Sequence, residues 1–185
     1  MRVLAGALKG QRLATPKGRT TRPTADQVRI ACLDTLMPYL EAGPFLDLFA
    51  GAGGVGIEAL SRGAPSAVFV ERDREAARAL EDNIARLGLT DRARSLRQDV
   101  SRALVALGRE GARFAVVFLD PPYAAASDGG AALEAIARGD CLLPAAVVVA
   151  QHPTKAPLPE APGLLTRWKD RRFGETTLTF FRGGA

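Results

Sequence analysis

The sequence predicts an α/β fold in which a mostly parallel, seven-stranded sheet ends in an antiparallel hairpin. Apolar runs alternate with amphipathic stretches over 45–151, which is typical of parallel strands joined by right-handed helical crossovers. A glycine-rich turn at 51–56 follows the first of these strands and leads into a helix. Beyond the proline-rich stretch 153–159 the alternation ends, and residues 164–169 and 176–181 are predicted to form the hairpin at the sheet edge.

Several elements are predicted ahead of this sheet. Residues 2–5 and 11–15 indicate a small β-hairpin, and a basic loop follows at 16–21. The segment Thr24 to Gln27 matches a helix capping box, and the helix that it begins is expected to end at Pro38 and Gly43-Pro44. We therefore distinguish an N-terminal extension and a main domain, with bounds at 1–44 and 45–185.

The main domain is predicted to hold five parallel strands and four helices. Gly63, Gly88 and Gly111 fall where helices are expected to end, since glycine adopts the left-handed conformation common after a helix C-terminus. The strands are expected near 45–50, 66–71, 94–98, 114–119 and 145–151, and the helices near 55–62, 74–87, 100–109 and 128–138.

The composition is typical of one globular domain. The 185 residues are 47% hydrophobic and 24% charged, and no apolar run approaches the roughly 20 residues of a membrane-spanning helix, so we expect no membrane partner. No signal peptide is predicted. Cys32 and Cys141 offer no disulfide framework, which favours the reducing cytoplasm. Together with a single histidine they are too few for a typical zinc site, so no metal site is expected.

Positive charge is concentrated in the N-terminal extension. Residues 1–40 hold seven basic and two acidic side chains, which accounts for the whole net charge of +5. Such an arm suits an acidic polymer, because each neutralised phosphate releases counterions, although a solvated basic surface has the same composition. The candidate phosphate contacts are Lys9, Arg12, Lys17, Arg19 and Arg22.

The glycine-rich turn leaves two classes of ligand open. Gly51, Gly53 and Gly56 fit the G-x-G-x-x-G fingerprint of dinucleotide sites, and Glu71 stands where that fingerprint places its ribose-binding acid. Asp47, however, lies inside the strand, where a pyrophosphate site presents apolar side chains. A carboxylate there suits a cationic ligand such as S-adenosylmethionine, which carries an ammonium and a sulfonium. A local backbone contact of Asp47 is the alternative.

Two more acids stand at the predicted carboxyl ends of strands, where open α/β sheets bind ligands. Glu71 ends the second strand and can accept hydrogen bonds from both hydroxyls of a ribose. Asp99 follows the third strand, where it can accept from an adenine amino group or cap the next helix. Both roles stay open for Asp99.

The stretch Asp120-Pro121-Pro122-Tyr123 follows a fully apolar strand. The prolines fix φ and lack N–H donors, so a stiff loop presents a carboxylate and a carbonyl beside an aromatic face. This arrangement suits an exocyclic base amine that donates to Asp120 and the Pro121 carbonyl while Tyr123 stacks on the base. Alignment then matters more than acid–base catalysis, because the sulfonium is a good leaving group. Taken alone, the motif also fits a simple stiff turn.

These motifs resemble those of class I methyltransferases that act on exocyclic amines. The match consists of Asp47-Leu-Phe-Ala-Gly-Ala-Gly and Asp120-Pro-Pro-Tyr. Residues 22–29, 56–63 and 173–177 narrow the resemblance to the RsmD family, and it covers nearly the whole chain. The closing motif reads Phe-Gly-Glu-Thr where a Tyr-Gly-Asp-Thr version is common, which is a conservative change.

The resemblance implies a Rossmann-like class I methyltransferase. Such an enzyme moves a methyl group from S-adenosylmethionine to N2 of a specific guanine in bacterial 16S ribosomal RNA, within the assembled small subunit, and releases S-adenosylhomocysteine. We expect a monomer. The candidate catalytic residues are Asp120, Pro121, Pro122 and Tyr123, the candidate RNA-binding residues are those of the basic arm, and the candidate cofactor-binding residues are Asp47, Phe49, Gly51, Gly53, Glu71, Arg72, Asp99, Val100 and Asp120.

Other functions stay open from the residues alone. The Asp-Pro-Pro-Tyr motif does not specify the base, so an adenine-N6 methyltransferase acting on DNA or RNA is the first alternative. An NAD-dependent oxidoreductase leaves Asp47 and Asp120 unexplained, and an inactive RNA-binding assembly factor leaves Asp120 and Tyr123 without a role. Among other residues, we expect His152 in a turn, Glu58 at a helix surface or behind the site, and Trp168 in packing.

Overall fold

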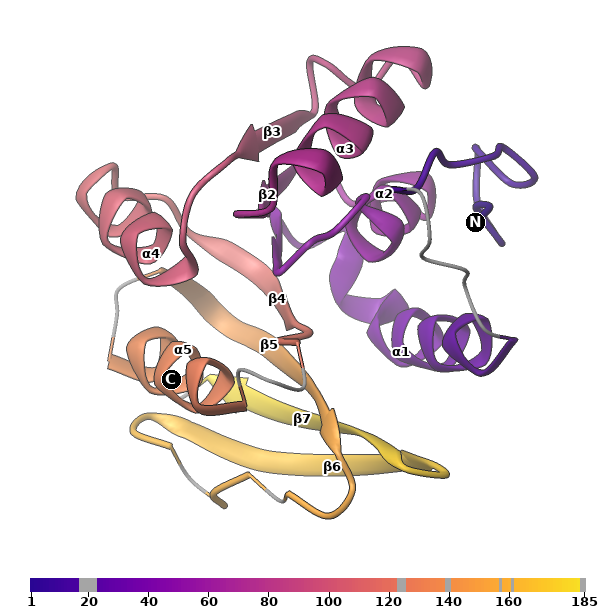
Figure 1. Ribbon diagram of the computed structural model, residues 1–185. Helices are drawn as coiled ribbons and strands as arrows, with labels where there is room; N and C mark the ends of the chain where they lie inside the picture. Colours follow the sequence, from indigo (N-terminus) through magenta and orange to yellow (C-terminus); the bar gives the residue numbers. More distant parts are fainter. Residues whose placement is uncertain (17–22, 123–125, 139–140, 157, 161, 184–185) are drawn as a thin grey trace.

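The computed structural model describes residues 1–16, 23–122, 126–138, 141–156, 158–160 and 162–183. Helices and strands alternate along the chain as far as residue 153, and two further strands follow (Figure 1). The helices are α1 (Pro23–Leu40), α2 (Gly54–Ser61), α3 (Arg74–Arg86), α4 (Val100–Arg109) and α5 (Ala126–Arg138). The strands are β1 (Phe45–Leu48), β2 (Ala67–Val70), β3 (Ala93–Leu96), β4 (Phe114–Leu119), β5 (Leu142–Pro153), β6 (Leu165–Phe173) and β7 (Thr176–Gly183). Within the described part of the chain, no helix is long and apolar enough to span a membrane.

The strands form one seven-stranded sheet in the order β3-β2-β1-β4-β5-β7-β6. Strands β1 to β5 run parallel, and β7 lies antiparallel between β5 and β6. The predicted parallel sheet with a terminal hairpin is therefore confirmed. The strand order reverses between β1 and β4, and the carboxyl ends of strands at such a point border a crevice that binds ligands in open α/β sheets.

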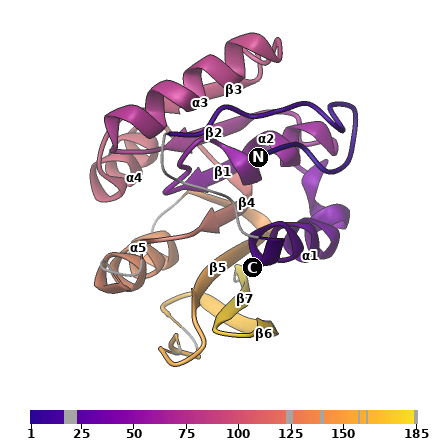
Figure 2. The same ribbon diagram turned by 45° about the vertical axis from the view of Figure 1, so that its right-hand side comes forward.

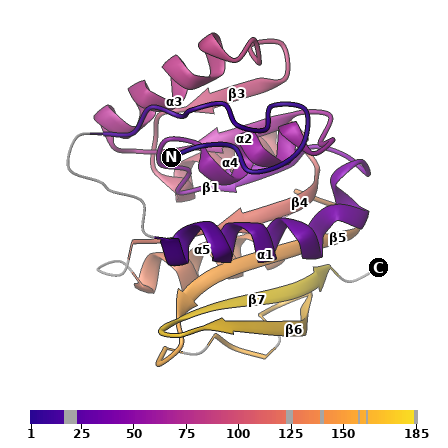
Figure 3. The same cartoon turned by 90° about the vertical axis from the view of Figure 1, so that its right-hand side faces the viewer.

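Helices cover both faces of the sheet (Figures 2 and 3). Because successive side chains of a strand point to opposite faces, β1 contributes to two separate cores. Phe45 packs with side chains of α1, α2 and α3, whereas Leu46 and Leu48 pack with those of α4 and α5. Asp47 has the same parity as Phe45 and therefore faces the layer that contains α2.

The N-terminal extension shares the first of these cores. Val3 and Leu13 are buried in the same cluster as Phe45 of β1, together with a row of apolar side chains along α1. In Figure 3, α1 lies across the sheet and the N-terminal segment runs over α2. The extension is thus packed onto the main domain and has no core of its own.

The predicted N-terminal hairpin differs in the structure. The N-terminal hairpin contains a single antiparallel bridge, between Arg2 and Arg12, because part of the segment bonds to α2: the Ala7 N–H donates to the Ser61 carbonyl at 2.8 Å. Helix α1 ends at Leu40, between Pro38 and Gly43-Pro44, as predicted. A proline in the last turn removes only one backbone hydrogen bond, and the burial of Leu40 in the core holds that turn in place.

Helix α2 approaches the sheet so closely that a side chain at Gly56 has no room. A Cβ atom at this position would lie 2.3 Å from Phe69 Cε1 and 3.0 Å from Asp47 Oδ2. Gly53 precedes α2 with a φ of 85°, a left-handed conformation that glycine adopts without strain. The glycines of the turn therefore serve two purposes, a tight bend and a close approach of helix to strand.

We predict that Gly56→Ala lowers the free energy of unfolding by about 1–3 kcal/mol, because Phe69 or α2 must move to accommodate the methyl group. Urea denaturation measures the change. Gly108→Ala is the matched control, since no atom outside its own part of α4 lies within 4 Å of the added Cβ. It is expected to leave stability unchanged or raise it by about 0.5–1 kcal/mol. Wild-type stability of Gly56→Ala would contradict the packing argument.

Candidate active site

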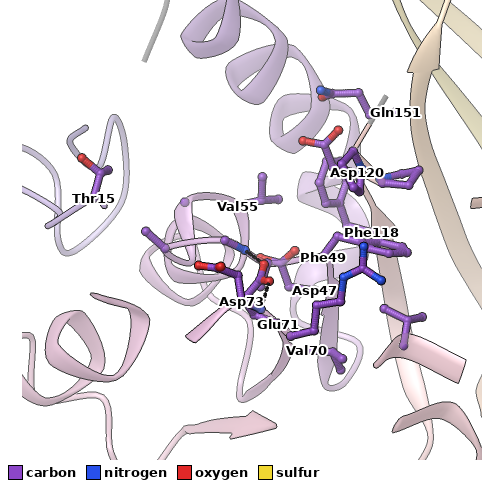
Figure 4. Close-up of a pocket in the computed structure, with 18 of the residues that line it drawn as sticks. Thr15, Asp47, Phe49, Val55, Val70, Glu71, Asp73, Phe118, Asp120 and Gln151 are labelled. Atoms are coloured by element: carbon purple, nitrogen blue, oxygen red, sulfur yellow. Dashed lines mark hydrogen bonds between the residues drawn. The ribbon is translucent and has the colours of Figure 1, made fainter. Parts of the chain in front are cut away.

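A pocket of about 790 Å³ opens at the carboxyl ends of β1 to β4 (Figure 4). Asp47 of β1 and Asp120, which follows β4, line this one cavity together with Glu71 after β2 and Asp99 after β3. The size is within the range of sites that enclose a small molecule or cofactor. The two acidic motifs that stand far apart in the sequence therefore belong to a single site.

Asp47 is held from the side of α2. Its side chain is 2% exposed, and Oδ2 accepts the N–H of Gly56 at 2.8 Å. Burial raises the pKa of Asp47 from 3.8 to about 7; the Gly56 hydrogen bond opposes this rise, and the nearby carboxylates of Asp120 and Glu71 add to it. The local backbone contact that the sequence left open is present, and Asp47 lines the pocket at the same time.

Glu71 fixes the glycine-rich turn. One carboxylate oxygen accepts the Gly51 N–H at 2.8 Å, and the other accepts the Asp73 N–H at 2.7 Å. Phe49 and Gly51 both have left-handed φ values, of 62° and 57°. Glu71 thus joins the tip of β2 to the turn after β1, and its remaining lone pairs are available to a ligand in the pocket.

Asp99 has the capping role that the sequence offered as one alternative. Its Oδ1 accepts the Ser101 N–H at 2.9 Å at the start of α4, and Oδ2 lies 3.9 Å from Nη1 of Arg72 at the exposed rim. Asp99, Arg72 and Val100 all line the pocket. A second acid, Asp73, caps α3 in the same way by accepting the Ala76 N–H at 2.8 Å.

Asp120 lies at the solvent-open side of the pocket. Its N–H donates to the Leu48 carbonyl at 3.4 Å, so the end of β4 is joined to the end of β1. Although the residue borders solvent, surrounding protein atoms desolvate the carboxyl and raise its pKa to about 7, while a hydrogen bond from the Gln151 side chain opposes the rise. Pro121 is backed by α5, where a Cβ at Gly129 would lie 2.6 Å from Pro121 Cγ.

The charge of the pocket favours a cationic ligand. Carboxylates outnumber the cationic side chains on its walls, and a pyrophosphate would place further negative charge among them. The chemistry of these groups therefore fits S-adenosylmethionine better than a dinucleotide. The acidic lining residues are Asp47, Glu71, Asp73, Asp99 and Asp120, and the basic ones are Arg29 and Arg72.

The structure brings most of the predicted site residues together, with some exceptions. Gly53 does not line the pocket, because its α-carbon faces Leu80 of α3. Lys9 and Arg12 are exposed on the segment that leads to the pocket wall at Thr15 and Pro16. Tyr123, Lys17, Arg19 and Arg22 lie outside the described residues. The predicted residues that do line the cavity are Asp47, Phe49, Gly51, Glu71, Arg72, Asp99, Val100, Asp120, Pro121 and Pro122.

Sequence reasoning missed Asn83. This fully buried side chain accepts the Ala14 N–H at 2.7 Å and donates to the carbonyls of Ala14 at 3.0 Å and Ala52 at 3.1 Å. It therefore ties the N-terminal segment to the glycine-rich turn. The available signal was its position between Leu80 and Ile84 on the apolar face of α3, where a polar residue needs buried partners.

Glu58 lies behind the site, as one of its two predicted alternatives has it, whereas His152 differs from the prediction. Glu58 is 0% exposed because the N-terminal segment and α1 cover α2; Oε2 lies 3.1 Å from Arg29 Nε, and Oε1 accepts from Arg62 Nη2 at 2.8 Å. His152 belongs to β5 and not to a turn, and its Nε2 lies 2.8 Å from Thr179 Oγ1. Trp168 does pack, edge-on against Tyr39 and Phe180.

Comparison with known proteins gives similarity along the whole chain. A family model described as conserved hypothetical protein 95 matches residues 1–182. The Bacillus subtilis (strain 168) protein named "Putative rRNA methyltransferase YlbH" is 38% identical over 182 residues, 98% of each chain. Ribosomal RNA small subunit methyltransferase D of Escherichia coli (strain K12) is 37% identical over 66% of this chain and 60% of that one. The solved structure described as "Putative methyltransferase yhhF from Escherichia coli" has a TM-score of 0.87 at 26% identity and covers 100% of this chain and 98% of that one.

We predict that Glu58→Ala lowers the free energy of unfolding by about 3–5 kcal/mol, because it leaves the buried guanidinium groups of Arg29 and Arg62, each 6% exposed, without this partner. Urea denaturation at neutral pH measures the loss. Glu110→Ala, which breaks an exposed pair with Arg94, is the control and is expected to behave like the wild type. Equal stability of the two variants would show that Glu58 does not support the extension.

Proposed function

Because this chain belongs to the RsmD family of ribosomal RNA methyltransferases, we propose that it transfers a methyl group from S-adenosylmethionine to the exocyclic N2 of a guanine in 16S ribosomal RNA. One observation carries the proposal: the carboxylates of Asp47 and Asp120 line the same pocket at the point where the strand order reverses. The first suits a cationic methyl donor and the second suits an amine acceptor, so the two reactants would meet there.

The cofactor side of the pocket would be formed by the tips of β1, β2 and β3. S-adenosylmethionine supplies an electrophilic methyl group on a sulfonium. Asp47 places negative charge near the cationic part of the ligand, and Glu71 offers acceptors to the ribose hydroxyls while it holds the Gly51 N–H. Asp99 and Val100 at the start of α4, with Arg72 after β2, form the wall next to which an adenine would lie.

The amine side would be formed by the loop after β4. Asp120 and the Pro121 carbonyl accept the two N–H groups of the guanine amine and direct its lone pair toward the methyl group. The raised pKa of Asp120 also suits this carboxylate to accept the N2 proton as the new N–C bond forms. Packing of Pro121 on Gly129 supports residues 120–122, which favours alignment. Stacking of Tyr123 on the base stays a prediction.

The RNA would approach across the N-terminal segment. Lys9 and Arg12 are exposed there, and the segment continues to Thr15 and Pro16 on the pocket wall. Single-stranded RNA is commonly read with a base splayed out of the strand and with phosphates held by basic side chains. We further propose that the substrate is the assembled small subunit, that the enzyme acts as a monomer and that it works in the cytoplasm.

We predict that Asp120→Ala abolishes methyl transfer and leaves the affinity for S-adenosylhomocysteine nearly unchanged, since Asp120 lies at the amine side of the pocket and the product lacks the sulfonium charge. Transfer of a radiolabelled methyl group to small subunits from cells lacking this protein measures activity, and calorimetric titration measures affinity. Retained turnover would refute the role of Asp120.

Nucleoside analysis of the wild-type product tests the function itself. N2-methylguanosine is expected; N6-methyladenosine would instead support the adenine enzyme. Calorimetric binding of NAD, with none of S-adenosylhomocysteine, would overturn the proposal.

We predict that Lys9→Gln combined with Arg12→Gln weakens RNA binding and lowers the slope of log affinity against log salt by roughly 1–2, because about one phosphate contact is lost per side chain. Filter binding at several salt concentrations measures the slope. The matched control is Arg109→Gln with Arg113→Gln, which removes two charges near the end of α4, on the opposite face of the sheet. Equal effects of the two pairs would indicate general charge and not a specific arm.

A further inference from the structure

Gln151 lies beside Asp120 at the carboxyl edge of the sheet. In the parallel pairing of β4 with β5, Leu119 is opposite Ala150, so the next residues of the two strands are neighbours. On its other side Gln151 pairs with Leu178 of β7 in an antiparallel register. Strand β5 pairs with β4 up to Ala150 and with β7 at Gln151, so the backbone that carries Gln151 belongs to the sheet and not to a loop.

Gln151 also stands where two cavities meet. It lines the large pocket that contains Asp47 and Asp120, and it lines a second, mostly apolar pocket of about 250 Å³ beside Pro121 and Pro122. Figure 4 shows its side chain next to Asp120, at the side of the site away from Glu71 and Asp73. It is therefore placed at the amine side of the pocket.

The chemistry of an amide is useful at this point. Gln151 is uncharged at every pH, yet its N–H groups can donate to a carboxylate, and its hydrogen bond with Asp120 favours the ionised form against desolvation. Of the other titratable groups, the Asp47 carboxyl of β1 interacts with Asp120, whereas burial raises the pKa of the Cys32 thiol of α1 so far that it stays neutral. An ionised Asp47 disfavours the charged form of Asp120 as burial does, and the Gln151 donor opposes both effects.

We propose that Gln151 is a positioning residue for Asp120. One N–H of its amide donates to one carboxylate oxygen, which fixes the rotation of the carboxylate and leaves the second oxygen to accept the amine of the target base. The inference rests on the proposed function of Asp120 and extends it to a residue that no sequence motif indicates. Gln151 does not touch the reacting atoms; it acts through the orientation and ionisation of its neighbour.

The direct test uses Gln151→Met, which keeps the length of the side chain and removes the donor. In the protein without cofactor or RNA, a carboxyl ¹³C NMR titration follows the ionisation of Asp120. The midpoint is expected to rise by about one pH unit relative to the wild type. Gln151→Glu, which adds a second carboxyl, is expected to raise it further and serves in place of Gln151→Met should that variant not fold. Wild-type midpoints in the folded variants would overturn the proposal.

The kinetic test asks for a change that a structural role would not produce. For Gln151→Met, kcat/KM for RNA is expected to be about fivefold lower at pH 7 and close to wild type at pH 9, with S-adenosylhomocysteine affinity unchanged. Gln27→Ala, at an exposed position of α1, is the control and is expected to keep the wild-type pH profile. A loss that is equal at both pH values would refute the action of Gln151 on the ionisation of Asp120. Absence of methyl transfer in the wild type would reject the proposed function alone, because the NMR titration judges Gln151 without it.

Discussion

The contact between Gly56 and Asp47 is the one on which the rest of the site depends. A buried carboxylate in the first parallel strand accepts the N–H of Gly56 at 2.8 Å, and only a glycine lets α2 come so close to β1 and β2. The contact fixes the glycine-rich turn between the strand and the helix. Glu71 then joins the same turn from the next strand, at Gly51. Three neighbouring elements thereby present their polar groups to one cavity.

Negative charge in this cavity destabilises the folded state and favours the binding of a cationic ligand. The pKa values of Asp47 and Asp120 are raised to about 7, so their ionisation is less favourable in the folded chain than in the unfolded one. The protonated forms of these two groups favour the folded state. This contribution to the free energy of unfolding is fully present below their ordinary pKa of 3.8 and is lost as the pH rises through 7. Near neutral pH the empty pocket therefore carries an electrostatic strain that a cationic ligand would relieve. A site of this kind gains affinity from the repulsion among its own groups.

Buried polar side chains of the core hold the N-terminal extension in position. Asn83 bonds both Ala14 and Ala52, and Glu58 joins the N–H of Leu4 to the guanidinium of Arg29. These buried contacts hold the exposed basic segment at a fixed position beside the pocket. The proposed contacts of this segment with RNA require a defined distance from the reacting atoms. The buried contacts with the core set that distance.

The sequence by itself determined the succession of strands and helices along the chain, the glycine-rich turn and the acids at the strand tips. Local periodicity and turn chemistry depend on residues close together in the chain, so these features can be predicted from it. The sequence also indicated Asp47 and Asp120 as a pair by their motifs. Only the tertiary structure decided that the two line one cavity, that Glu58, Asn83 and His152 are buried, and that Gln151 lies beside Asp120. Those features arise from contacts between residues distant in sequence, and burial or hydrogen bonding by a distant segment leaves no periodic trace in the chain.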